Sequence, residues 1–505
     1  MYLVTREEMK QYDKNTIEQY HIPSMVLMER AALSVCSEIK IRFSPECGKI
    51  LVLCGAGNNG GDGFAIARIL HLAGYKVEIL FAMKEASMTP EARAQCNTAK
   101  RYGVPVFVHL KEEPYAVIVD ALFGIGLSRT IEGTLKELLD DINSRASFRI
   151  AVDISSGVSA DTGEILGAAF CADLTVTFAF AKVGQLLYPG AEYTGELLIS
   201  DIGIEKNSFL GKPPLGTYLG KDEMKALLPA RKPYSNKGSY GKALIVAGSP
   251  AMAGAAYFAA KAAYYSGCGL VRVFTAAENR EILLTKLPEA IITAYSGQDE
   301  KEAARLLKEG IQWADAVLIG PGISQSRMAE RLLEETLSYP AKKIVFDADA
   351  LNLISRKKDA LKQSDGEWVV TPHLGEMSRL TGEDIAAIQK QLLPSALALA
   401  GKYRLTCVLK DARTVIGLPD GTFFINTTGN HGMATGGSGD VLAGLLTGFL
   451  AQGMSVKDAS ALAVCLHGTA GDLAKEEIGA RGMIATDLLE HIPLAIKNGE
   501  ENESA

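Results

Sequence analysis

Two glycine-rich segments of the sequence carry carboxylates and amides that could bind phosphate and move protons. One is GAGNNGGDG at residues 55–63, and the other is GNHGMATGGSGD at residues 429–440. Each stands directly before an apolar run with helical spacing, so bare backbone N–H groups are expected at a helix N-terminus. The helix dipole adds partial positive charge there. The sequence therefore predicts two anion sites, each with an aspartate close by.

The first segment contains the dinucleotide-binding pattern GxGxxG at Gly55, Gly57 and Gly60. A nicotinamide-dependent dehydrogenase would also place an acid at the end of the second strand, about 20 residues on, to hold the ribose. Here Glu78 falls within the expected strand and Glu85 comes late. The pattern alone is therefore weak evidence for a dehydrogenase.

The same segment is rich in side-chain oxygen atoms. Asn58, Asn59 and Asp62 suit a hard, weakly hydrated cation as well as a nucleotide, and a tight turn with an aspartate cap is the alternative. Asp120 and Asp153 each stand at the carboxyl end of another expected strand and precede glycines and hydroxyls. In an open parallel sheet, ligands collect beyond the carboxyl ends of the strands. Three polar strand ends at one edge therefore predict a binding site.

In the second segment, GGSGD runs directly into the apolar helix VLAGLLTGFL, whose small residues favour close packing. The amides of Gly437, Ser438 and Gly439 would converge at the positive end of that helix. Asp440 is then either a helix cap or a base that takes a proton from a hydroxyl attacking phosphate. The run of glycines favours the base, because a cap needs no such flexible approach. The chain has no GxxxxGK[ST] sequence, so a P-loop is not expected.

Strands alternating with helices must position these residues. In the first half, strands are expected at 49–55, 76–81, 104–108, 115–120 and 148–155, helices at 64–74 and 89–103, and helical spacing over 1–45. In the second half, strands are expected at 242–248, 270–275, 314–320, 343–350, 367–372 and 407–411. Prolines and glycines interrupt the pattern at 208–223. We therefore expect two α/β domains, at 1–212 and 213–505, each a parallel sheet covered by helices on both faces.

Composition excludes several classes of protein. The 505 residues exceed what one core usually organises, and 48% hydrophobic with 22% charged residues excludes a largely disordered chain. The net charge of 52 − 59 = −7 gives no general attraction for nucleic acid or anionic lipid. The eight cysteines are scattered without a CxxC, so neither a disulfide framework nor a zinc site is expected. A charged N-terminus and the lack of a long apolar run predict a cytoplasmic protein without a membrane segment.

The N-terminal half resembles the YjeF N-terminal family, the NAD(P)H-hydrate epimerases. The shared blocks, in order, are LMERAA (27–32), CGAGNNGGDGF (54–64), VDALFGIGLSR (119–129) and VDISSG (152–157). Ser155 departs from the family pattern, which usually has proline there. The resemblance implies a Rossmann-like three-layer α/β/α domain.

This resemblance also implies roles for individual residues. The hydrated nucleotide would be held by Asn58, Asn59, Gly60, Gly61, Asp62, Gly124, Ile125, Gly126, Leu127, Ser128, Arg129, Thr130 and Asp153. A potassium ion would be bound by Asn59, Asp120 and Ser156. Asp153 would be the acid or base at the epimerising carbon.

Residues 220–495 resemble the ADP/ATP-dependent NAD(P)H-hydrate dehydratase family, which has the ribokinase-like α/β/α fold. The shared blocks are NKGSYGKALIVAGS (236–249), GPG (320–322), VFDADALN (345–352), TPHLGE (371–376), LKDART (409–414) and GNHGMATGGSGDVLAG (429–444). Leu374 and His431 stand where proline is common, and Asp411 stands where glycine is common.

This second resemblance implies a catalytic base at Asp440. The hydrated nucleotide would face Gly254, Gly322, His373 and Asp440. ADP or AMP would contact Lys410, Asp411, Ala412, Arg413, Thr414 and Gly439. Without the surrounding TPHLGE block, His373 would instead be interpreted as a loop residue bonded to backbone.

Together the two resemblances imply a bifunctional repair enzyme for hydrated NADH and NADPH. The N-terminal domain would interconvert the R and S forms, and the C-terminal domain would dehydrate the S form with ADP or ATP and Mg²⁺. A homo-oligomer acting on small molecules is expected, with no nucleic-acid or membrane partner. Two alternatives stay open: a ribokinase-like small-molecule kinase with a nucleotide-sensing N-terminal domain, and a binding protein or sensor without turnover.

Overall fold

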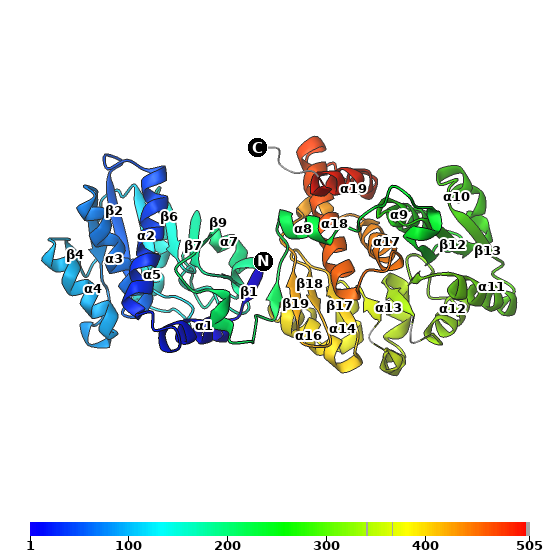
Figure 1. The fold of residues 1–505 in the computed structure, drawn as a ribbon, viewed down its shortest axis with the longest axis horizontal. Helices are drawn as coiled ribbons and strands as arrows, with labels where there is room; N and C mark the ends of the chain where they lie inside the picture. Colours follow the sequence, from blue (N-terminus) through cyan, green and yellow to red (C-terminus); the bar gives the residue numbers. More distant parts are fainter. Residues whose placement is uncertain (340–341, 366, 501–505) are drawn as a thin grey trace. The chain divides into compact units, whose positions relative to one another are not determined.

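The computed structural model describes residues 1–339, 342–365 and 367–500, and the chain forms two compact units (Figure 1). One unit is Tyr2–Gly216, and the other is Thr217–Ala505 together with Met1. The division falls within the proline- and glycine-rich stretch 208–223. Each unit is an α/β structure built on a largely parallel sheet, as expected from the alternation of strands and helices.

The N-terminal unit is built on a seven-stranded sheet with the order β4-β3-β2-β5-β6-β7-β9, and all its strand pairs are parallel. The strands are β2 (Lys49–Cys54), β3 (Lys76–Leu80), β4 (Val106–Phe107), β5 (Val117–Ala121), β6 (Phe148–Val152), β7 (Leu174–Phe178) and β9 (Glu196–Ser200). A short strand β1 (Tyr2–Val4) pairs in parallel with β8 (Ala181–Lys182). The strand order reverses between β2 and β5, and the crevice that such a reversal leaves is where ligands bind in open α/β sheets.

Helices cover both faces of this sheet. They are α1 (Arg6–Glu18), α2 (Ser24–Arg42), α3 (Asn58–Leu72), α4 (Pro90–Arg101), α5 (Thr134–Ser144), α6 (Val183–Leu186) and α7 (Gly190–Thr194). Successive residues of β2 point to opposite faces: Ile50 and Val52 join the core formed with α2, α3 and α4, whereas Leu51 joins the core formed with α5. Both faces of β2 are therefore buried, which explains its uninterrupted apolar sequence.

The helix after the first glycine segment begins earlier than the sequence pattern predicts. It begins at Asn58 rather than at residue 64, because the amide of Gly61 already donates to the carbonyl oxygen of Gly57 at 3.1 Å. A Cβ atom at Gly60 would lie 1.9 Å from the carbonyl oxygen of Gly55, so only glycine permits this close turn. The glycine loop is thus partly the first turn of the helix itself.

The C-terminal unit has the strand order β13-β12-β11-β14-β15-β16-β17-β18-β19. The strands are β11 (Lys242–Val246), β12 (Leu270–Ala276), β13 (Ile291–Tyr295), β14 (Ala316–Ile319), β15 (Lys343–Phe346), β16 (Trp368–Val370), β17 (Thr406–Leu409), β18 (Val415–Gly417) and β19 (Phe423–Ile425). The pairs from β13 to β17 are parallel, and β18 and β19 complete the edge as antiparallel strands. Here the order reverses between β11 and β14.

Two packed helices lie over the centre of this sheet, α9 (Ala253–Tyr265) and α17 (Ser438–Ala451). The remaining helices are α8 (Lys221–Leu227), α10 (Arg280–Lys286), α11 (Glu300–Trp313), α12 (Arg327–Leu337), α13 (Ala348–Ile354), α14 (Leu374–Thr381), α15 (Ile385–Lys390), α16 (Leu392–Tyr403), α18 (Val456–Ile478) and α19 (Ala485–Glu500). A Cβ atom at Gly444 would lie 2.1 Å from the carbonyl oxygen of Ala259, so α17 and α9 touch backbone to backbone.

All eight cysteines are free thiols, and Cys54 and Cys407 are fully buried as small core residues. Within the described residues, no helix is both long enough and apolar enough to cross a membrane.

The close contact of α17 with α9 at Gly444 can be tested by substitution. Gly444→Ala should destabilise the C-terminal unit by about 1–3 kcal/mol, because overpacking outweighs the roughly 1 kcal/mol that alanine gains over glycine in a helix. Gly401→Ala is the matched control, since a Cβ at this α16 position meets nothing within 4 Å. Differential scanning calorimetry should show a lower transition temperature for Gly444→Ala and an equal or higher one for Gly401→Ala. Equal gains in both variants would contradict the close contact.

Candidate functional site

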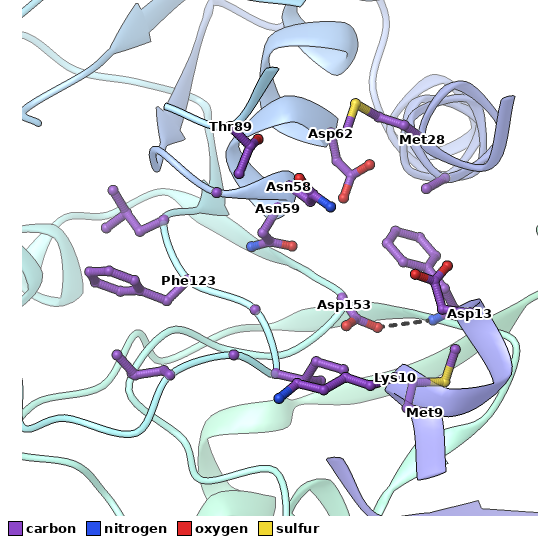
Figure 2. Close-up of a pocket in the computed structure, with 18 of the residues that line it drawn as sticks. Met9, Lys10, Asp13, Met28, Asn58, Asn59, Asp62, Thr89, Phe123 and Asp153 are labelled. Carbon is purple, nitrogen blue, oxygen red and sulfur yellow. Dashed lines mark hydrogen bonds between the residues drawn. The ribbon is translucent and has the colours of Figure 1, made fainter. Parts of the chain in front are cut away.

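The N-terminal unit contains a cavity of about 710 Å³ at the carboxyl ends of its central strands (Figure 2). Its wall is formed by residues of α1 and α2, by the glycine segment at the start of α3, by the loop that follows β5 and by Asp153 after β6. It therefore lies at the strand-order reversal between β2 and β5.

Most of the predicted N-terminal residues line this cavity. They are Asn58, Asn59, Asp62, Gly124, Ile125, Gly126, Leu127, Ser128, Arg129 and Asp153. Gly60 and Gly61 form the turn behind this wall instead, where a Cβ at Gly61 would lie 2.6 Å from the Cε atom of Met28. Thr130 packs beside Gly167, at the far end of its loop.

Asp120 and Ser156 form one buried hydrogen-bond cluster. The Ser156 hydroxyl donates to Oδ1 of Asp120 at 2.7 Å, and the Ser156 amide donates to Oδ2 at 2.7 Å. Asp120 is fully buried, and burial raises its pKa to about 6 in spite of these hydrogen bonds. Asn59 lies against Gly124, and its Nδ2 atom is buried without a hydrogen-bond partner among the described residues. A buried amide of this kind is an open position for a ligand.

Asp153 is held by a buried lysine that the sequence analysis missed. Asp153 has a φ of +67°, in the left-handed region that non-glycine residues rarely adopt. Its Oδ1 atom pairs with Nζ of Lys182 and accepts from the hydroxyl of Thr177 at 3.2 Å. The Lys182 side chain is fully buried, and burial lowers its pKa. The signal in the sequence was a single lysine within the apolar stretch TFAFAKVGQLL.

Two more carboxyl groups face Asp153 across the cavity. Asp62 comes from α3, and Asp13 comes from α1 (Figure 2). Burial, followed by the charges of Asp153 and Asp13, raises the pKa of Asp62 well above its usual range. Burial and Asp153 also raise the pKa of Asp13. The helix α3 is capped by Gly57, so the interpretation of Asp62 as a helix cap is wrong.

In the C-terminal unit, Asp440 lies in the first turn of α17. The N-cap of this helix is Gly437, with a φ of +93° and no side-chain hydrogen bond, so Asp440 is not the cap. Burial, then Asp347, raises the pKa of Asp440 to about 7, and Lys410 opposes the shift. A carboxyl group with such a pKa can exchange protons at neutral pH.

Lys410 lies beside the glycine segment. A Cβ at Gly439 would lie 3.2 Å from Nζ of Lys410 and 4.0 Å from Oδ2 of Asp347. Nζ of Lys410 pairs with Oδ1 of Asp347 at 2.9 Å, and Thr371 donates to the same oxygen at 2.7 Å. Lys410 belongs to the same sequence block as residues 411–414, which form the turn between β17 and β18, whereas Asp347 is not among the predicted site residues.

His373 caps helix α14. Its Nδ1 atom accepts from the amide of Gly375 at 3.0 Å, while Oε2 of Glu376 accepts from the amide of His373 at 2.9 Å. Its other ring nitrogen, Nε2, lies 3.5 Å from Oε1 of Glu376, and the side chain is 55% exposed. Burial raises the pKa of Glu376 to about 7. Glu376 and the ring of His373 therefore lie next to Lys410, whose amide donates to the carbonyl oxygen of Pro372.

The other predicted C-terminal residues surround the starts of two helices. Gly322, with a φ of +61°, packs against Met252 and Ala255 at the start of α9, where Gly254 also lies. The ring of Phe258 lies near both Gly254 and Gly437, so the N-termini of α9 and α17 meet. His467 is a buried histidine that is not among the predicted residues. Its Nε2 atom lies 2.9 Å from the carbonyl oxygen of Ser438, and burial lowers its pKa to about 4.

Two family models match the chain, one in each half. The model described as YjeF-related protein N-terminus matches residues 24–184, and the model described as NAD(P)H-hydrate dehydratase matches residues 243–494. Both families are those that the sequence blocks indicated, so the two resemblances are confirmed.

Curated relatives match along nearly the whole chain. The bifunctional NAD(P)H-hydrate repair enzyme Nnr of Moorella thermoacetica is 38% identical, over 99% of this chain and 98% of the relative. The enzyme of the same name from Escherichia coli is 35% identical, over 92% of this chain and 87% of the relative.

Solved structures match the C-terminal half. An ADP/ATP-dependent NAD(P)H-hydrate dehydratase from Bacillus subtilis, co-crystallised with ATP and Mg²⁺, is 31% identical with a TM-score of 0.50, over 56% of this chain and 98% of that chain. A ribokinase-like superfamily protein from Enterococcus faecalis is 31% identical with a TM-score of 0.51, over 57% of this chain and 98% of that chain. The predicted fold class is confirmed. From both family matches and the full-length relatives, we conclude that this chain belongs to the family of bifunctional NAD(P)H-hydrate repair enzymes.

Proposed function

We propose that this chain repairs hydrated NADH and NADPH with two separate active sites. The N-terminal cavity interconverts the R and S epimers of the hydrated nicotinamide ring. The C-terminal site dehydrates the S form with ADP or ATP, giving AMP or ADP and phosphate. The observation that carries the proposal is the position of Asp440: its carboxyl group, with a pKa of about 7, lies beside Lys410 at the glycine-rich start of α17.

Asp440 is the base of the dehydration. Its carboxylate takes the proton of the ring hydroxyl, whose oxygen then attacks the terminal phosphorus of the nucleotide. Departure of phosphate with the electron pair of the C–O bond, and loss of a ring proton, restore the double bond. The nucleotide makes this possible because phosphate leaves far more readily than hydroxide. Lys410 and the glycine amides neutralise charge on the transferred phosphoryl group.

Residues Lys410 to Thr414 and Gly439 bind the adenine nucleotide, and Gly254, Gly322 and His373 face the hydrated nucleotide. The ends of α9 and α17 that meet around Phe258 support this assignment. Mg²⁺ is usually held by one or two carboxylates together with substrate phosphates. Asp347 and Glu376 lie beside Lys410 and fit that donor set, so they would hold Mg²⁺ when the nucleotide is bound.

In the N-terminal cavity, Asp153 is the acid or base at the epimerising carbon. The segments Asn58 to Asp62 and Gly124 to Thr130 hold the hydrated nucleotide. Asn59, Asp120 and Ser156 fit a potassium ion by their chemistry, because each carries a side-chain oxygen, whereas the open Nδ2 atom of Asn59 would donate a hydrogen bond to the nucleotide. Potassium would order the loop after β5 around the nucleotide.

Asp440→Asn should remove the dehydratase activity and leave epimer exchange unchanged. Loss of a general base costs about 10²- to 10⁴-fold in rate. The assay follows the recovery of reduced-nicotinamide absorbance and of free phosphate from the S epimer. Asp359→Asn is the matched control, because this aspartate of the same unit has an 85% exposed side chain. A wild-type product that stays phosphorylated would instead indicate a small-molecule kinase.

The dehydratase reaction should depend on pH through Asp440. Its pKa is raised from 3.8 to about 7, and only the ionised carboxyl accepts a proton, so kcat/KM should rise as pH increases through about 7. Initial rates across neutral pH, at saturating nucleotide, measure this rise of kcat/KM with pH. A profile flat through neutral pH would contradict the role of Asp440 as the base.

Asp153→Asn should abolish epimer exchange and leave dehydration of the S form intact. The single variant should also be destabilised by about 3–5 kcal/mol, because Lys182 then carries a buried charge without its partner. The double variant Asp153→Asn with Lys182→Met should regain much of that stability but none of the epimerase activity. Chromatographic separation of the epimers and thermal unfolding measure the two effects. Restored exchange in the double variant would show that Asp153 acts only through folding.

A further inference from the structure

The N-terminal cavity contains a carboxyl group whose chemical task the proposed function leaves open. Asp62 is 9% exposed, and no hydrogen bond or ion pair to its carboxyl group occurs among the described residues. Buried carboxyl groups normally have such partners. Figure 2 shows the Asp62 carboxyl directed from α3 into the cavity. Its partner is therefore expected to come from a bound molecule.

The groups that face Asp62 favour its protonated form. Asp153 and Asp13 point toward the same space from the end of β6 and from α1, and their charges add to the effect of burial in raising the pKa of Asp62 well above its usual range. The cationic residues Lys10 and Arg129 line the cavity too, and neither contributes to that shift. Asp153 differs from Asp62 because Lys182 forms an ion pair with it. One carboxyl of the cavity thus has a cationic partner, and the one opposite has none.

We propose that Asp62 is the general acid of epimerisation and that Asp153 is the base on the opposite face of the hydrated ring. This inference rests on the proposed epimerase function of the cavity. It gives Asp62 a role in the reaction itself, beyond contact with the nucleotide. Two carboxyl groups on opposite sides suit the reaction, because epimerisation removes a hydroxyl from one face of a carbon and returns it to the other.

The steps balance without an oxidant or a reductant. Asp62 gives its proton to the hydroxyl oxygen, and the C–O bond breaks with its electron pair going to oxygen, so that water leaves. The lone pair of the neighbouring ring nitrogen forms a C=N bond. Water then adds to the other face, the C=N pair returns to nitrogen, and Asp153 takes the proton. Asp62 is left ionised and Asp153 protonated, and proton exchange with solvent resets them; in the reverse direction their roles are exchanged.

The test compares Asp62→Asn with wild-type full-length protein. Asparagine keeps the shape of a protonated aspartate but has no acidic proton to give, so kcat for epimer exchange should fall at least about 100-fold while KM changes little. The wild-type rate should fall at high pH as Asp62 ionises, and the residual rate of the variant should not show this decrease at high pH. Asp140→Asn is the matched control, since its side chain lies on the surface of α5 and is 57% exposed.

The kinetic measurements decide whether Asp62 is the general acid of epimerisation. Unchanged kcat, or a rise in KM alone, overturns the proposal and leaves Asp62 a binding residue at most. A variant whose rate still decreases at high pH overturns the proposal as well. If wild-type protein dehydrates the S form but exchanges no epimers, the epimerase function of the cavity has failed, and the inference fails with it. A cooperative thermal transition of the N-terminal unit in Asp62→Asn shows that the variant is folded.

A second measurement needs no substrate. Because the pKa of Asp62 is raised in the folded state, its stabilising effect is present below the unfolded value of 3.8 and is lost as pH rises toward the folded value. Asp62→Asn should therefore raise the transition temperature of the N-terminal unit at neutral pH, with a gain that shrinks in acid. The infrared absorption of protonated carboxyl groups should also lose one component in this variant, while the contributions of Asp440 and Glu376, whose pKa values are about 7, remain. A transition temperature lowered by Asp62→Asn at neutral pH, or an unchanged carboxyl band, would overturn the protonated state on which the inference depends.

Discussion

Both sites depend on one constraint of parallel sheets, the reversal of strand order at the centre. At β2 and β5 in one unit, and at β11 and β14 in the other, neighbouring chain segments leave in opposite directions and open a crevice at the strand ends. Glycine segments then let the backbone come close to that crevice. At the two sites, Asp153 and Asp440 meet residues that are distant in sequence, Asp13 and Asp62 in one unit and Asp347 and Lys410 in the other.

Burial determines what the carboxyl groups at these crevices can do. Asp120, Asp62 and Asp440 all have raised pKa values, and burial is the largest cause for each. Two other aspartates have a lysine partner instead: Lys182 pairs with Asp153, and Lys410 pairs with Asp347. The local surroundings thus differ from one aspartate to the next: some are buried with a raised pKa, and others have a lysine partner.

The sequence predicted the fold class and the positions of both glycine segments because these depend on local patterns. Most of the central strands were predicted to within a few residues, whereas β7, β9, β13 and the β18–β19 pair were missed. Lys182, Asp13 and Asp347 could not be assigned to a site, because each reaches it through tertiary packing that no local spacing encodes. Asp13 lies on a helix far from the glycine segments in sequence, and only the fold brings it to the cavity wall.

The backbone-to-backbone contact between α17 and α9 has a consequence for how this enzyme can change over evolution. Gly444 follows Asp440 by one helical turn, so both lie on the same side of α17. A substitution that widens the gap to Ala259 would also shift the Asp440 carboxyl group relative to Lys410. Turnover and thermal robustness of this unit are therefore tied to one interface, and selection for either property must act on both together.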